Sequence, residues 1–193
     1  MFSLNRTETF SQDIKKSCFR ATAAAVADEA EVRAFLTAQS EPSANHNCWA
    51  WRIGQAFRFS DDGEPSGTAG RPILQAIDGQ ELDRVAVVVT RWFGGILLGS
   101  GGLVRAYGGA AAACLSQAEK TAIVPSVAVR IACVFSDLAR VKARLLALPD
   151  VTAEGETFTE TGAELSFRLP AEQAERILRT VADMTSGRAR VSI

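Results

Sequence analysis

The sequence is poor in the residues that build most metal and redox sites. It contains one histidine, and no Cys-x-x-Cys pair occurs, whereas a zinc site needs clustered cysteine and histidine ligands. We therefore expect no metal ion and no cofactor. We interpret the scattered cysteines as small buried residues, with a disulfide as the alternative. The four are Cys18, Cys48, Cys114 and Cys133.

The sequence also lacks a long apolar run and an excess of one charge. No segment approaches the roughly 20 apolar residues of a transmembrane helix, and the first residues lack a secretion pattern. We expect a cytoplasmic protein without membrane contact. The net charge is −1, with 12 basic against 13 acidic residues up to position 124 and 9 of each beyond it. Bulk charge therefore does not predict strong non-specific binding of nucleic acid.

The sequence contains enough apolar residues to form a hydrophobic core. Of 193 residues, 47% are hydrophobic and only 6 are prolines, which excludes a disordered chain. The clearest break in pattern falls near Pro125, after an alanine-rich helical stretch and before a new strand. We predict two domains, 1–124 and 125–193, of the α+β class, with a monomer as the default state.

The last 69 residues predict the order β-α-β-β-α-β of a ferredoxin-like domain. The first helix is expected to be capped by Ser136 or Asp137, and the second to open at Pro170. This fold hosts many functions and decides none. The expected strands are 127–135, 151–159, 163–169 and 188–193.

The first 124 residues alternate less regularly. Asp28 and Glu31 have capping-box spacing ahead of a helix, and Trp49 and Trp51 share one face of a strand. An unbroken valine run predicts a fully buried strand at 85–89. Other expected elements are a strand at 18–26 and helices at 71–77 and 103–118.

An acidic loop spans Ser60 to Pro72. Its carboxylates could hold a divalent cation or form a binding surface, although their spacing is not that of an EF-hand. Alternatively, Asp61 and Asp62 satisfy loop amides while Ser66 or Thr68 caps the next helix. The candidate binding residues here are Asp61, Asp62, Glu64, Ser66, Thr68 and Arg71.

A glycine-rich loop spans Thr90 to Arg105. It is not a P-loop, because Ser100 stands where the phosphate-binding lysine belongs, and Val104 breaks the dinucleotide fingerprint. The loop either holds a phosphate or acidic group or is a tight connection between strand and helix. The candidate binding residues here are Arg91, Gly94, Gly95, Gly99, Gly101, Gly102 and Arg105.

Enzymatic chemistry has little support in the sequence. Nucleophilic catalysis would need His46 as its base, for example with Ser66 or Ser100 and Asp62, and no Gly-x-Ser-x-Gly elbow is present. His46 is therefore a weak catalytic candidate, and a lone histidine is more often structural.

Four blocks together resemble the YigZ/IMPACT family. They are Lys15–Phe19, Asn45–Gly54, Ser60–Pro72 and Val88–Tyr107. The resemblance covers about residues 15–118, and the remainder resembles the domain appended in the bacterial branch. Several multi-residue blocks in the right order are more specific than any single glycine motif.

The resemblance implies a fold for each domain and a role related to translation. The N-terminal domain is expected to look like the second domain of a small-subunit ribosomal protein, and the C-terminal domain like domain V of elongation factor G. Eukaryotic relatives regulate translation by binding a ribosome-associated scaffold, which the bacterial members lack.

From this we expect a non-catalytic, translation-associated protein that contacts RNA, the ribosome or a translation factor. In this hypothesis the two loops converge, the carboxylates orient Arg91 and Arg105, and these arginines engage an anionic partner. The alternative is a small hydrolase or transferase that uses the same loops on a phosphorylated or peptide substrate.

Overall fold

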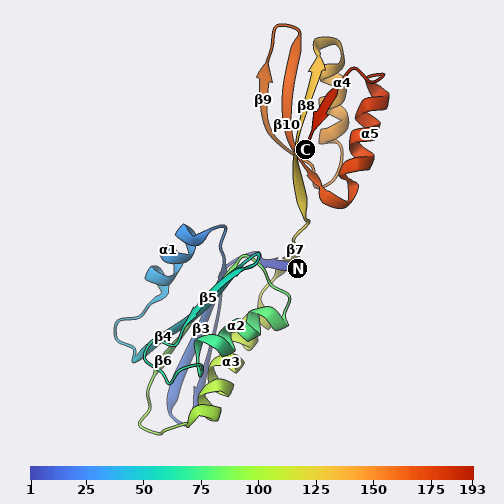
Figure 1. Cartoon of the computed structure of the whole chain (residues 1–193). Helices are drawn as coiled ribbons and strands as arrows, with labels where there is room; N and C mark the ends of the chain where they lie inside the picture. Colours follow the sequence, from blue (N-terminus) through green and yellow to red (C-terminus); the bar gives the residue numbers. More distant parts are fainter. The chain divides into compact units, whose positions relative to one another are not determined.

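The chain divides into two units, Met1–Ile123 and Val124–Ile193, in a computed structural model that describes residues 1–193 (Figure 1). Each unit has a hydrophobic core of its own. Both combine helices with antiparallel sheet, which confirms the predicted α+β class. None of the helices is long and apolar enough to cross a membrane.

The first unit is built on a five-stranded antiparallel sheet. The valine run lies in the central strand, β6, which is buried from Val85 to Arg91, as the sequence predicted for its first five residues. Helices cover both faces of the sheet, so this central strand needs apolar residues on both faces. The strand order is β2 (Glu8–Ile14), β3 (Ser17–Ala25), β6 (Val85–Trp92), β4 (His46–Ile53) and β5 (Ala56–Ser60).

Helices cover both faces of this sheet. Helices α2 (Gly70–Gly79) and α3 (Ser100–Gln117) enclose the main core on one face, and α1 (Glu29–Gln39) packs on the other (Figure 1). The alternation predicted for β4 is confirmed, because Ala50 lies in the main core while Trp51 packs with Val32 of α1.

The ends of the first unit are paired in a way the sequence did not predict. Strand β1 (Phe2–Leu4) lies antiparallel to β7 (Lys120–Ala122), so that residues more than a hundred positions apart are joined. Helix α3 begins at Ser100, three residues before the predicted start. Gly99, with φ of 70°, makes this early start feasible because a left-handed conformation suits glycine.

The second unit has the predicted β-α-β-β-α-β order. Its sheet is antiparallel in the order β11 (Arg190–Ser192), β8 (Ser126–Val134), β10 (Gly162–Pro170) and β9 (Thr152–Phe158), the arrangement of a split βαβ domain. The helices are α4 (Phe135–Leu146) and α5 (Ala174–Met184), the latter preceded by the short turn η1 (Ala171–Gln173).

The predicted cap of α4 is wrong. The helix begins at Phe135, and no side chain caps it. Asp137 is buried instead and accepts hydrogen bonds from the guanidinium of Arg188 at 3.0 Å and from Arg140 at 3.3 Å. A buried carboxylate needs cationic partners, and these arginines outcompete the helix amides for it.

Candidate functional site

A buried ion pair joins the acidic and the glycine-rich loops. The Nη1 atom of Arg91 donates to Oε1 of Glu64 at 2.6 Å, and the hydroxyl of Tyr107 donates to the same oxygen at 2.7 Å. The side chains of Glu64 and Arg91 are only 4% and 5% exposed. The two loops therefore converge, as expected, but through a pair that faces inward.

Burial corrects the role expected for Arg91. Its guanidinium lies between the rings of Phe19 and Phe93, 5.4 Å and 5.3 Å from their centroids, and its Nη2 reaches Ser17 at 3.4 Å. A cation neutralised by a carboxylate in such a setting serves the fold and is not free to engage an anionic partner. Its Nε atom is buried without a hydrogen-bond partner.

The acidic loop is organised by Asp61. Its Oδ1 accepts from the amides of Ala69 at 2.9 Å and Gly70 at 2.8 Å, and its Oδ2 accepts from Gly67 at 2.8 Å. Burial raises the pKa of this carboxyl, but the three N–H donors outweigh it and hold the pKa below the ordinary aspartate value. Asp61 thus supplies the acceptor at the start of α2.

Thr68 and Asp62 of this loop form local hydrogen bonds, whereas Ser66 is exposed and forms none. Thr68 donates its hydroxyl to the carbonyl of Pro65 at 2.6 Å, and Asp62 accepts from the amide of Asn47 at 2.5 Å. The expectation that Ser66 or Thr68 caps α2 is therefore wrong, because the longer loop folds Asp61 back onto those amides. No group of three or more histidine, cysteine, aspartate or glutamate side chains has the geometry of a metal site.

His46 stands beside the buried pair. Its Nδ1 donates to the carbonyl of Asp62 at 2.8 Å, which leaves Nε2 facing Oε1 of Glu64 at 3.8 Å. No serine hydroxyl hydrogen-bonds to His46, so the serine arrangements considered from the sequence are not assembled. Burial raises the pKa of the neighbouring Cys48 to about 12, which keeps that thiol protonated at neutral pH.

A pocket of about 400 Å³ opens over these groups. Its floor is polar and comes from His46, Glu64 and Arg91. Its rim carries the large apolar side chains of the segment between β6 and α3, together with the polar Asn45 and Ser100. In this segment Phe93 is 42% and Leu97 is 84% exposed. The surface therefore presents large apolar groups above a polar floor whose charges already pair.

The glycine-rich loop is fixed to the neighbouring β2–β3 turn. A Cβ atom at Gly94 would lie 1.9 Å from the carbonyl oxygen of Lys16, so only glycine fits there. The amide of Gly94 also donates to the hydroxyl of Ser17 at 3.1 Å. Gly95, with φ of 82°, and Gly99 adopt left-handed conformations, whereas Gly101 and Gly102 lie in the first turn of α3.

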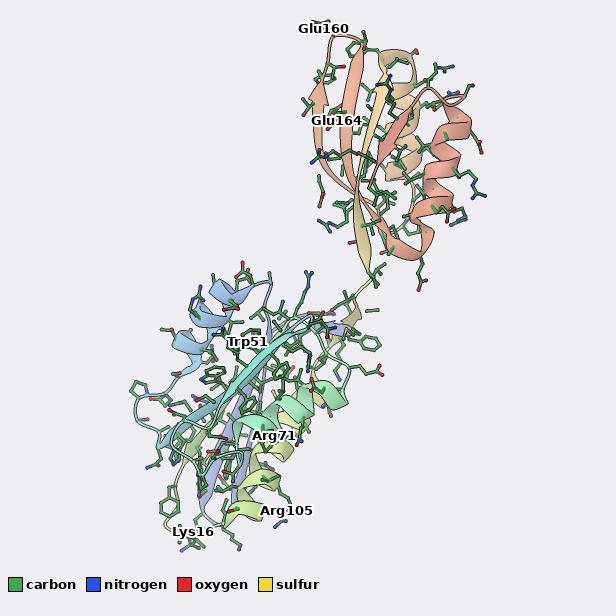
Figure 2. All side chains as sticks on the ribbon, viewed as in Figure 1. Lys16, Trp51, Arg71, Arg105, Glu160 and Glu164 are labelled. Atoms are coloured by element: carbon green, nitrogen blue, oxygen red, sulfur yellow. The ribbon has the colours of Figure 1, made fainter.

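The remaining candidate residues, Arg71 and Arg105, differ in whether they line a pocket. Arg71 and Arg105 are exposed and form no ion pair, and only Arg105 lines a pocket beside the glycine-rich loop (Figure 2). Sequence reasoning missed Tyr107 and Leu97 as members of the site. Helical spacing from Leu103 places Tyr107 on the buried face of α3, and this signal could have identified it.

Comparisons with known proteins place the chain. Residues 15–115 match the family model described as the Impact N-terminal domain, and residues 131–188 match a Domain of unknown function (DUF1949). An IMPACT family member of Thermus thermophilus is 47% identical over 176 residues, covering 91% of this chain and 97% of its own. The chain belongs to the IMPACT family. The IMPACT family member YigZ of Escherichia coli is 34% identical over 93% of this chain and 90% of its own.

One solved structure is similar to this chain along nearly its whole length. A crystal structure of a hypothetical protein is 32% identical and superposes with a TM-score of 0.76, covering 98% of this chain and 95% of its own. A structure of the two-domain translational regulator Yih1 is 30% identical over 61% of this chain and 47% of its own, with a TM-score of 0.36. The human Protein IMPACT is 38% identical over 95 residues, and the match spans 29% of its length.

Proposed function

We propose that this IMPACT family protein is a non-catalytic, translation-associated binding protein, and that the pocket over Glu64 and Arg91 receives a segment of a protein partner. The partner is a ribosomal protein or a translation factor. The single observation that carries the choice of a protein is the apolar rim, where Phe93 and Leu97 are exposed beside a polar floor. The link to translation comes from family membership.

RNA is the less favoured partner at this pocket. Stacked bases also use exposed aromatic rings, but nucleic-acid affinity depends chiefly on cations that neutralise phosphates. Arg91 is already paired with Glu64, which leaves no free cation on the pocket floor. Exposed apolar side chains near a pocket are, by contrast, the usual mark of a protein interaction site.

The proposal also covers the detailed fold of each unit, the oligomeric state and the cellular location. The first unit would correspond to the second domain of a small-subunit ribosomal protein, and the second unit to domain V of elongation factor G. A protein of this kind would act as a monomer in the cytoplasm, where ribosomes and translation factors are found.

Sedimentation of cell extract through a sucrose gradient tests the proposal. We expect the wild-type protein to migrate with ribosomal particles. The variant Leu97→Asp should reduce this fraction at least about ten-fold, equivalent to about 1.4 kcal/mol of binding free energy. The matched control is Leu146→Asp in the second unit, because Leu146 is also exposed, at 54%. This control should behave like the wild type.

Three outcomes would overturn parts of the proposal. If the wild-type protein stays at the top of the gradient at low salt, the proposed association with the ribosome is wrong. If the Leu97→Asp variant migrates with ribosomes as the wild type does, the pocket is not the contact surface. Release of the protein by a moderate increase in salt, with Leu97→Asp still bound at low salt, would identify RNA as the partner.

A further inference from the structure

A second pocket adjoins the one already described. It measures about 290 Å³ and lies between the β2–β3 turn and α3. Leu98 lines both pockets and therefore forms the ridge between them. The lining of the second pocket includes the cations Lys15 and Arg105 and no acidic residue.

The cations of this pocket have no counter-ions. Lys15 and Arg105 are exposed, as is the adjacent Lys16, which does not line the pocket. None of the three forms an ion pair or a side-chain hydrogen bond. Figure 2 shows Lys16 and Arg105 at the same end of the first unit. The nearest acidic residue of the hairpin is Asp13, which strand alternation places on the opposite face from the pocket-lining Gln12 and Ile14.

The conformation of the β2–β3 turn positions the two lysines. Lys15 and Lys16 form the two-residue turn between Ile14 and Ser17, with φ of 46° and 67°. Left-handed turns of this length favour asparagine and glycine, so two lysines here are costly. The contact of Gly94 with the carbonyl of Lys16 fixes this turn against the apolar segment.

Resting on the proposed function, we infer that the two pockets form one groove for a peptide segment that carries an acidic side chain close to a large apolar one. The apolar side chain occupies the first pocket, against Phe93, Leu97 and Leu103. The carboxylate lies across the Leu98 ridge, between Lys15 and Arg105. Charge complementarity selects this occupant, because the groove offers unpaired cations on one side of the ridge and exposed apolar groups on the other.

Selection from a random peptide library displayed on phage tests the inference with the full chain as bait. We expect the selected peptides to share an acidic residue within a few positions of leucine, isoleucine or phenylalanine. One selected peptide, labelled with fluorescein, then serves as the probe in anisotropy titrations. Binding should weaken at least about ten-fold for Leu97→Asp and for the double variant Lys15→Glu, Arg105→Glu.

Matched controls separate the groove from general charge. Arg58→Glu removes an exposed cation outside both pockets and should leave the peptide affinity unchanged. Replacing the acidic residue of the peptide by lysine should abolish binding to the wild type and restore it to the Lys15→Glu, Arg105→Glu variant. This exchange is specific to direct pairing, because a misfolded variant would bind neither peptide.

The inference is overturned if the selected peptides carry no acidic preference, or if the double variant binds them as the wild type does. It is also overturned if a single-stranded RNA oligonucleotide binds more tightly than any selected peptide and Leu97→Asp leaves that binding intact. Failure here is distinct from failure of the proposed function, because wild-type migration with ribosomes does not depend on the peptide. Peptide binding without migration with ribosomes would support the peptide groove and would contradict the proposed association with translation.

Discussion

The carboxylate of Glu64 depends on donors from two distant parts of the first unit. Replacing Arg91 by methionine would leave this charge buried without its cation, so we expect the free energy of unfolding to fall by about 3–5 kcal/mol. Tyr107→Phe removes one hydrogen bond and should cost about 1–2 kcal/mol. Urea unfolding followed by circular dichroism measures both. Arg71→Met, at an exposed position, is the control and should change stability by less than about 0.5 kcal/mol. An Arg91→Met variant as stable as this control would contradict the buried pair.

The two buried thiols of the first unit, Cys48 and Cys114, should be inert in the folded protein. Burial raises the pKa of Cys48 to about 12 and that of Cys114 to about 11, so both remain protonated at pH 8. Because the thiolate is the reactive form, iodoacetamide should leave both unmodified until urea unfolds the chain. Mass spectrometry of tryptic peptides reports the labelling, with the partly exposed Cys18 as the internal comparison. Fast alkylation of Cys48 in the native state would contradict this prediction and would favour the hydrolase or transferase alternative.

At the scale of elements, the start of α2 depends on one carboxylate. Removing it in Asp61→Ala should destabilise the protein by about 1–2 kcal/mol, the usual range for a lost cap. Because the pKa of Asp61 is lowered in the folded state, its stabilisation is complete above the ordinary aspartate pKa, about 3.9. It is lost as the pH falls through the lower pKa of the folded state.

The pH dependence separates this cap from a simple loss of side-chain packing. Urea unfolding at pH 7 and in the acid range should show the difference between wild type and Asp61→Ala narrowing as the pH falls. Asp61→Asn keeps one acceptor oxygen and loses the charge, so its deficit at pH 7 should be smaller than that of the alanine variant. A difference that stays constant down to the acid limit would contradict the role given to this carboxylate.

Elements with strong local signals could be predicted from the sequence, and those that depend on distant partners could not. The valine run of β6 and the alternation of Ala50 and Trp51 identify their strands because burial on each face dictates residue type. Strand β1 has three residues and depends on distant partners, because it pairs with β7 and also forms a bridge to Leu82. Length and local pattern carry no information about such a pairing.

The candidate site shows the same division between local and distant effects. The sequence located both loops and brought Glu64 and Arg91 into the candidate set, because charged residues beside glycines mark unusual backbone. It did not reveal that the arginine points inward, since burial of Arg91 depends on Phe19 from another strand and on Phe93. The binding surface that we propose is therefore centred on Phe93 and Leu97 and not on the arginine.

At the scale of the whole molecule, each unit encloses a hydrophobic core of its own. We therefore expect the fragments 1–123 and 124–193 to fold separately and to reproduce the two thermal transitions of the full chain. Phe167→Ala opens a cavity in the core of the second unit, where Phe167 is 1% exposed, and should cost about 3–5 kcal/mol in that unit. Ile73→Ala is the reciprocal change in the first unit.

Differential scanning calorimetry of the full chain and both fragments measures the coupling between the units. With Phe167→Ala, the transition assigned to fragment 124–193 should move to lower temperature while that of fragment 1–123 stays in place, and Ile73→Ala should do the opposite. Movement of both transitions in either variant would show that each unit stabilises the other. A peptide groove confined to residues of the first unit would then have to be tested for its dependence on the second, because binding energy and folding energy would be linked across the chain.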